Sequence, residues 1–289
     1  RRRKATRDER RKSALGFDKV TIRARRVPVR RTSRAAHRPR RSRTTLASLA
    51  LMGALFAAAN AAAYRPFDGT DGGVAETGHF ELELGPVHYY RERDVSYLIA
   101  PATVLNLGIA PRFELVSDFQ NFVSGERVPA LQHDRVLNTD LLLKWVAREG
   151  VLQDKTGPSI AFEGGLLLPE LGGNDGFGAQ LDGIVSARGK VGALHLNSQI
   201  ADAHDHHLDV FESLILEGPD AWSPRPVAEL YVDNEFGGSR RLSALAGVIW
   251  DASPFIAVDA AGRYGTIDGH PVEEVRLGFT WVVPVWDAK

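Results

Sequence analysis

The feature that most constrains this chain is an alternation of apolar and polar residues with a period of two. It begins near residue 79 and continues to residue 283. Successive side chains of a strand point to opposite faces, so this pattern predicts strands with one apolar and one polar face. No long segment has the 3.6-residue period of an amphipathic helix, so an all-β fold is predicted. The last stretch alternates Val275, Leu277, Phe279, Trp281 and Val283 with Glu274, Arg276, Gly278 and Thr280.

Turn signals divide this part of the sequence into twelve predicted strands, an even number. Strands of about ten residues in antiparallel order are compatible with a soluble sandwich, a propeller or an up-and-down outer-membrane barrel. Three of them, 96–109, 208–218 and 240–250, are apolar on both faces and therefore carry the weakest signal. The predicted strands are 78–90, 96–109, 111–122, 135–148, 157–169, 177–188, 190–201, 208–218, 224–233, 240–250, 254–263 and 272–283.

The connections between the predicted strands favour the membrane barrel. With a periplasmic N-terminus, the periplasmic turns include 110–111, 188–190 and 251–254, most of them short. The opposite connections are longer and include 123–134, 170–176, 202–207, 234–239 and 264–271. Short periplasmic turns and longer outer loops are typical of bacterial outer-membrane barrels.

Aromatic residues gather at the predicted strand ends, which also favours a membrane barrel. Aromatic rings with polar tips are stable where the bilayer meets water, so a barrel carries two aromatic girdles. A soluble core would scatter them. The predicted periplasmic girdle contains Phe80, Phe113, Trp145, Trp222, Trp250, Phe255 and Trp281, and the outer girdle contains Tyr89, Tyr90, Tyr97, Phe119, Phe122, Phe177, Phe211, Tyr231 and Tyr264.

The N-terminal part of the chain predicts export. Residues 1–43 contain 19 Lys or Arg and three acidic residues, which indicates an upstream extension of the coding region or a long basic n-region. Residues 44–63 combine a short apolar run with small residues at the end, as in a cleaved signal peptide; a retained anchor or a buried core helix is the alternative. The mature chain would then consist of a polar segment, 64–77, followed by a barrel, 78–289.

The charge of the mature chain excludes some partners. The whole chain has 36 basic and 36 acidic residues, so without residues 1–43 it has 17 basic and 33 acidic ones, a net charge near −16. Such a surface argues against nucleic acid and anionic membrane surfaces as partners. The expected partners are outer-membrane lipid, small-molecule solutes and, during biogenesis, the barrel-assembly machinery. No cofactor is expected. The chain contains no cysteine, so burial and hydrogen bonds must hold the fold.

Short pieces of the chain resemble a known family. They are 64–71, 75–85, 141–144, 157–163, Leu168-Pro169 and 278–281, spread over most of residues 64–283. The chain resembles the outer-membrane transporter-like proteins assigned to the meta-pathway of phenol degradation. This resemblance implies an outer-membrane barrel that passes aromatic or other apolar compounds, and it brings no catalytic residues.

Charged and polar residues on the predicted inner face are the candidate site. Unpaired buried charges are costly, so these residues must form ion pairs across the interior or line water. A closed, salt-bridged interior and a narrow pore with cation preference are both compatible with twelve strands. The polar segment 64–77 is compatible with a periplasmic tail or with a plug in the lumen. The predicted lumen-lining residues are Glu81, Glu83, Arg112, Glu114, Asp118, Asp140, Lys144, Glu163, Asp182, Arg188, His195, Glu229, Asp259, Arg263, Glu274 and Arg276.

Two other kinds of site have weaker support in the sequence. His204, His206 and His207 lie among aspartates and could bind a divalent metal, but a solvated outer loop is the favoured explanation, because adjacent His206 and His207 do not easily point at one ion from a strand. His195 and Ser198 could form a base–nucleophile pair, but residues three apart on a strand point to opposite faces. We therefore predict no enzymatic activity. The favoured function is a passive channel; a non-conducting outer-membrane barrel and a soluble periplasmic β-rich binding protein are the alternatives.

Overall fold

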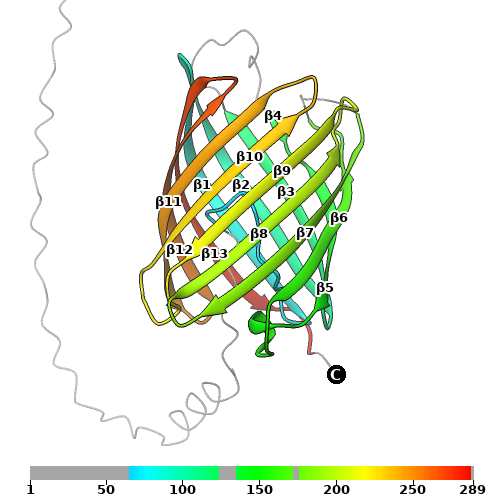
Figure 1. The fold of residues 1–289 in the computed structure, drawn as a ribbon, viewed down its shortest axis with the longest axis vertical. Coiled ribbons are helices and arrows are strands. Elements are labelled where there is room, and N and C mark those ends of the chain that lie inside the picture. The colour runs from blue at the N-terminus through cyan, green and yellow to red at the C-terminus, as the bar shows by residue number, and fades with distance from the viewer. Residues whose placement is uncertain (1–64, 124–134, 172–175, 288–289) are drawn as a thin grey trace, which may run out of the picture. The chain divides into compact units, whose positions relative to one another are not determined.

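The computed structural model describes residues 65–123, 135–171 and 176–287. These residues form strands β1 to β13 and one turn of 3₁₀ helix, η1 (Val151–Gln153) (Figure 1). Within these ranges no helix is long and apolar enough to cross a membrane. The predicted leader (1–43) and signal peptide (44–63) lie outside the described residues. The strands are β1 (His79–Glu92), β2 (Val95–Ala110), β3 (Phe113–Val123), β4 (Arg135–Leu137), β5 (Asp140–Arg148), β6 (Ser159–Leu167), β7 (Gly178–Gly189), β8 (Gly192–Asp202), β9 (Leu208–Glu217), β10 (Arg225–Glu235), β11 (Arg240–Ser253), β12 (Ile256–Ile267) and β13 (His270–Pro284).

The sheet closes into a barrel of twelve antiparallel strands. Each strand pairs with its neighbours in sequence, β13 pairs with β1, and β2 pairs with β3. β4 and β5 both pair with β3 and are two pieces of one strand, interrupted at Asn138 and Thr139. The predicted fold class and strand number are therefore confirmed, including the three strands with weak signals.

The two faces of the wall differ as the alternation predicted. On β13, Glu274, Arg276 and Thr280 are buried, whereas Leu277 and Trp281 are about half exposed. The same division runs around the barrel, so large apolar side chains cover the outside and charged side chains lie inside. A soluble protein does not expose a continuous apolar band of this kind, whereas a membrane barrel requires one.

The two ends of the barrel differ in their connections. At one end, Val285 N donates to Gly78 O at 2.7 Å, so the start of β1 and the end of β13 meet there; we call it the terminal end. The opposite end, which contains residues 93–94 and 203–207, is the loop end. The expected contrast in loop length is only partly present. The predicted loop 264–271 is a two-residue turn, Asp268–Gly269, and a ten-residue connection, 149–158, lies at the terminal end.

This short turn has a local cause. Asp268 and Gly269 both have positive φ angles, 52° and 79°, which a type I′ turn requires. Because the turn matches the twist of the flanking strands, β12 and β13 continue beyond the ends predicted for them.

The aromatic girdle at the terminal end is present on the outside. Trp145 stacks with Phe113 and Phe162 at centroid distances of 6.4 and 6.2 Å. At the loop end the prediction is partly wrong, because several of the aromatics assigned to the outer girdle lie on inner positions and line a cavity instead. These are Tyr90, Tyr97, Phe122, Phe211 and Tyr231.

Candidate functional site

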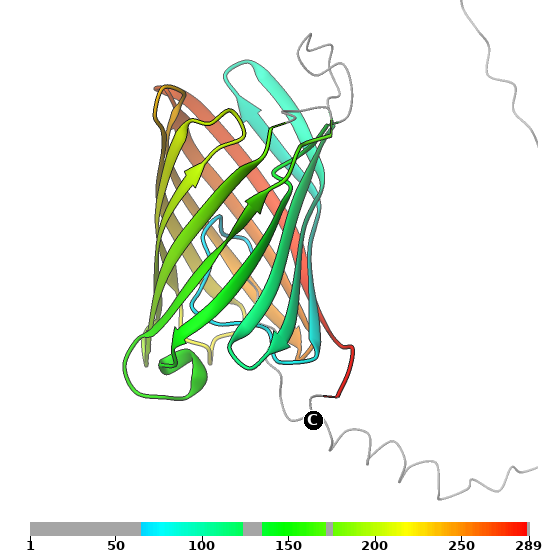
Figure 2. The ribbon, with the colours of Figure 1, turned by 90° about the vertical axis from the view of Figure 1, so that its right-hand side faces the viewer.

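A chain segment lies inside the barrel. Residues Arg65–Ala75, which we call the luminal segment, precede β1 and cross the interior in the half nearer the terminal end (Figure 2). Its small residues permit close approach to the wall, because a Cβ on Gly69 would lie 2.9 Å from Asn197 Nδ2 and one on Gly72 would lie 3.2 Å from Ser186 Oγ. Of the two interpretations that the sequence allowed, a periplasmic tail and a segment folded into the lumen, the structure shows the second.

Buried carboxylates of the wall accept hydrogen bonds from the backbone of this segment. Glu229 accepts from the N–H groups of Asp68 at 2.9 Å and Gly69 at 2.8 Å, and Ser213 Oγ also donates to it at 3.0 Å. Ionised carboxylates are strong acceptors for backbone N–H groups. Glu83 likewise accepts from Arg65 N at 3.0 Å, and Glu114 accepts from Ala75 N.

Side chains of β5, β7 and β8 complete the ring of contacts. Asn197 Oδ1 accepts from Thr70 N at 2.9 Å, and Ser186 Oγ accepts from Gly72 N at 2.7 Å. Lys144 Nζ donates to Thr70 Oγ1 at 2.9 Å. The segment is therefore bonded to β1, β3, β5, β7, β8 and β10, on all sides of the interior. The acidic excess of the inner face, which sequence analysis left without partners, is in part a set of acceptors for this segment.

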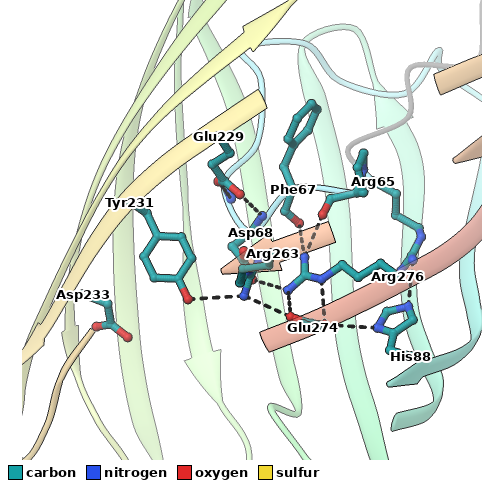
Figure 3. Close-up of polar contacts among 12 residues, drawn as sticks. Arg65, Phe67, Asp68, His88, Glu229, Tyr231, Asp233, Arg263, Glu274 and Arg276 are labelled. Carbon is teal, nitrogen blue, oxygen red and sulfur yellow. Dashed lines mark hydrogen bonds and ion pairs between the residues drawn. The ribbon is translucent and has the colours of Figure 1, made fainter. Parts of the chain in front are cut away.

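Two arginines on neighbouring strands hold the first half of the segment (Figure 3). Arg276 donates to Pro66 O at 2.7 Å and to Asp68 Oδ1 at 3.0 Å, and its Nε donates to Glu274 at 2.7 Å. Arg263 pairs with Asp68 and lies 3.3 Å from Glu274. Two carboxylates thus compensate two buried guanidinium groups, as a stable buried cluster requires.

Arg65 extends to the other side of this cluster. Its Nε lies 3.3 Å from Asp259 Oδ2, and its Nη2 donates to His88 Nε2 at 2.8 Å. Because a guanidinium has no acceptor, the histidine nitrogen accepts here, and its Nδ1 faces Glu274 at 3.6 Å. The Arg65 side chain fits against the wall at Gly85 and Gly278, where an added Cβ would overlap with it.

A serine, a histidine and a glutamate follow one another in contact beneath the segment. Ser186 Oγ is 2.7 Å from His195 Nδ1, and His195 Nε2 is 3.2 Å from Glu217 Oε1. A nucleophilic serine must reach its substrate. Ser186 is fully buried and accepts from Gly72 N, so this chain of groups fastens the luminal segment. Ser198 faces outward, away from His195, as predicted.

Most of the predicted lumen-lining residues point into the barrel. Arg112 and Arg188 do not. Both are exposed at the terminal end, Arg112 in the β2–β3 turn with Glu149 at 2.6 Å, and Arg188 near Asp220 at 3.3 Å. The bond from Arg112 lowers the pKa of Glu149. These two predictions were wrong because strand parity does not tell where the wall ends.

The other predicted lumen-lining residues lie on the inner face. Asp118, Asp140 and Glu163 are partly exposed to the interior, and the buried ones are Glu81, Glu83, Glu114, Lys144, Asp182, His195, Glu229, Asp259, Arg263, Glu274 and Arg276.

Sequence analysis missed His88 and Tyr90 as inner residues. The alternation of β1 shifts by one residue between Leu84 and Val87, where the register with β13 has a bulge. Pro86 lies at this point and lacks the N–H that a ladder needs. The pair Gly85-Pro86 was therefore the available signal for a change of face.

The three histidines of the β8–β9 connection do not form one site. His204 contacts Gly176 O at 3.0 Å, and His206 contacts Asp202 at 3.2 Å. His207 groups with Asp205 and Glu235, whose donor atoms lie within 4.8 Å of one another. The N–H of His207 lowers the pKa of Asp205, and the His207 ring lies 2.9 Å from the same carboxylate. Each of these histidines thus has polar partners within the loops of this end.

Two adjoining cavities lie between the luminal segment and the loop end. Their volumes are 390 and 280 Å³, and Asp68, Gln120 and Asn138 line both. We call the two cavities together the vestibule. Its floor is the luminal segment at Asp68.

Comparisons with known proteins support the fold. No protein-family profile and no curated protein sequence matches the chain. Among solved structures, an outer membrane channel from Pseudomonas putida F1 is similar with a TM-score of 0.55 and 12% identity, over 75% of this chain and 100% of that one. The KdgM porin (TM-score 0.45, 9% identity, 70% and 98% covered) and the CymD monoaromatic hydrocarbon channel (0.42, 10%, 74% and 90%) are less similar. At these identities the likeness extends to the fold, an outer-membrane type of barrel.

Proposed function

We propose that this protein is an outer-membrane channel for the passive passage of small molecules, and that the luminal segment is its plug. The observation that carries the proposal is the filling of the barrel interior by a segment that belongs to no wall strand. The segment bonds to eight strands, which include β12 and β13, yet its displacement breaks no strand pairing. A solute could then pass from the vestibule to the terminal end.

The chemistry of the contacts supports a plug that can leave. Almost all of them are polar, so water can replace them, at a net cost of about 0.5–1.5 kcal/mol for a neutral hydrogen bond and about 1.5–3 kcal/mol for one to a charged group. The main apolar contact is that of Phe67 with a small cluster of Val227, Ile249 and Ala257. A segment meant to stay permanently would bury more apolar surface, because burial is the dominant stabilising term.

The orientation and the substrates belong to the same proposal. The terminal end faces the periplasm and the loop end faces the medium, as in bacterial barrels generally. Residues 44–63 act as a cleaved export signal. Aromatic or apolar solutes are suggested by the resemblance to the phenol-pathway transporter-like proteins. A non-conducting binding barrel is the second candidate, favoured by the closed interior.

Fractionation of cells that express the full chain tests this proposal. We expect recovery in the outer membrane, a mass that places the new N-terminus near residues 62–64, and a gel mobility that changes on heating in detergent. In planar bilayers the protein should show intermittent openings. Recovery as a soluble periplasmic protein without the mobility change would contradict the membrane assignment, and a permanently silent bilayer would favour the second candidate.

A further inference from the structure

The larger cavity of the vestibule is acidic. Seven of its lining residues are Asp or Glu, and none is Lys or Arg. Among the residues that the structure describes, Asp118, Asp140 and Asp182 have no cationic group within 4.0 Å. Asp182 is 4% exposed, and its Oδ1 accepts from Ser198 N at 3.0 Å. Buried carboxylates without a cation are costly unless a positive group can reach them.

A neutral side chain of the same cavity also has an unused acceptor. Asn106 is fully buried, and its Nδ2 donates to Glu83 at 2.9 Å. Its Oδ1 has no hydrogen-bond partner within the described part of the chain. Buried acceptors are normally satisfied, so this oxygen indicates that a donor is expected in the cavity.

The smaller cavity presents aromatic rings. Tyr90 and Tyr97 are stacked with centroids 4.8 Å apart, and Phe122 lies 5.7 Å from Tyr97. Aromatic faces attract cations and pack well against other rings.

The arginines that line this cavity are compensated. Arg263 and Arg276 pair with Asp68 and Glu274, and Arg241 lies 3.8 Å from Asp233. The vestibule therefore has carboxyl groups on β3, β5 and β7 without a cationic partner in the described ranges, next to aromatic rings on β1, β2 and β3, and the arginines beside these rings are compensated.

We propose that the vestibule binds small organic cations that carry an aromatic ring, such as arylalkyl ammonium ions. The ammonium group would lie against Asp118, Asp140 and Asp182, and the ring would stack on Tyr90 and Tyr97. Cavities of about 300–1,000 Å³ suit small ligands. The larger part of the vestibule, 390 Å³, falls in this range, and the smaller part, 280 Å³, lies just below it and adjoins the larger one. This inference rests on the proposed function, because it names the solute class that reaches the plug.

Calorimetric titration of the full protein in detergent tests the inference. The probes are benzyltrimethylammonium, tetramethylammonium, which lacks the ring, and benzyl alcohol, which lacks the charge. We expect benzyltrimethylammonium to bind at least about tenfold more tightly than either, because the two walls act together. Equal binding of benzyl alcohol, or equal binding of tetramethylammonium, would overturn the inference.

Substitutions of vestibule residues test where the aromatic cation binds. Asp182→Asn keeps the acceptor for Ser198 N and removes the charge, so binding should weaken about tenfold. Tyr97→Leu should weaken binding of benzyltrimethylammonium and leave that of tetramethylammonium nearly unchanged. Glu273→Gln is the matched control, since Glu273 pairs with Arg91 on the outer surface. Unchanged binding by Asp182→Asn, with a normal heat-dependent mobility shift, would exclude the vestibule as the site.

The result is independent of conduction. Binding of the aromatic cation by a protein that never opens would uphold this inference and contradict the channel. Openings in bilayers without preferential binding of the aromatic cation would uphold the channel and contradict this inference.

Discussion

Deletion of residues 65–75 is expected to convert the closed barrel into a steadily conducting one. The deletion removes the luminal segment, whose backbone N–H groups donate to side chains of the wall, and it leaves every wall strand intact. Water then replaces the segment, and the interior of a twelve-stranded barrel is wide enough to pass small ions. The mean single-channel conductance should rise on the order of tenfold or more above that of the full chain.

The control for this variant is a test that the barrel still folds. Without Asp68, Glu274 alone pairs with Arg263 and Arg276, and the water and counter-ions that enter the emptied lumen must compensate the remaining charge. The wall strands keep their pairing, so the barrel should assemble and show the heat-dependent mobility shift. A deletion variant that folds but stays as closed as the full chain would mean that wall side chains fill the lumen, as in the closed, salt-bridged interior that the sequence also allowed.

Replacement of Arg276 by Met is expected to give the largest loss of stability among single substitutions. Arg276 and Glu274 are both buried, and Arg276 also donates to Pro66 O and Asp68. Removal of one partner of a buried pair typically costs 3–5 kcal/mol. Arg263 remains 3.3 Å from Glu274, so we expect the lower part of this range, about 3 kcal/mol in the free energy of unfolding by urea in lipid.

Arg91 provides the control, because it lies on β1, which pairs with β13, the strand that carries Arg276. Arg91→Met breaks an exposed pair with Glu273 at 3.7 Å, and such pairs contribute less than about 1 kcal/mol. Arg276→Met should also raise the frequency of openings, because the first half of the luminal segment loses two contacts. Equal effects of the two substitutions would show that the buried cluster does not stabilise the barrel.

The barrel could be predicted from sequence because its signal is local. The alternation along β13 and the Asp268–Gly269 turn each lie within a few neighbouring residues. The dipeptide Asp268–Gly269 is itself a hairpin signal, although a longer loop, 264–271, is predicted there. Likewise Gly85-Pro86 marked the bulge that turns His88 and Tyr90 inward.

The site could not be predicted because its contacts are long-range. Glu229 accepts from Gly69 across 160 residues of sequence, and no periodicity relates them. Inward charges such as Glu229 and Arg276 follow from strand parity, but their partners depend on where the segment before β1 lies. The rim positions of Arg112 and Arg188 were missed for a related reason, since the height of the wall depends on the register of all strands.

The measurement that tests the central claim most directly is the conductance of a Gly72→Cys/Ser186→Cys double variant, oxidised and then reduced. The chain has no other cysteine, and a Cβ on Gly72 would lie 3.2 Å from Ser186 Oγ, close enough for a disulfide. The two single-cysteine variants are the controls. If the luminal segment is the plug, the oxidised protein stays closed and openings return on reduction. If the current is the same in both states, with the disulfide verified by mass, the segment does not gate the barrel.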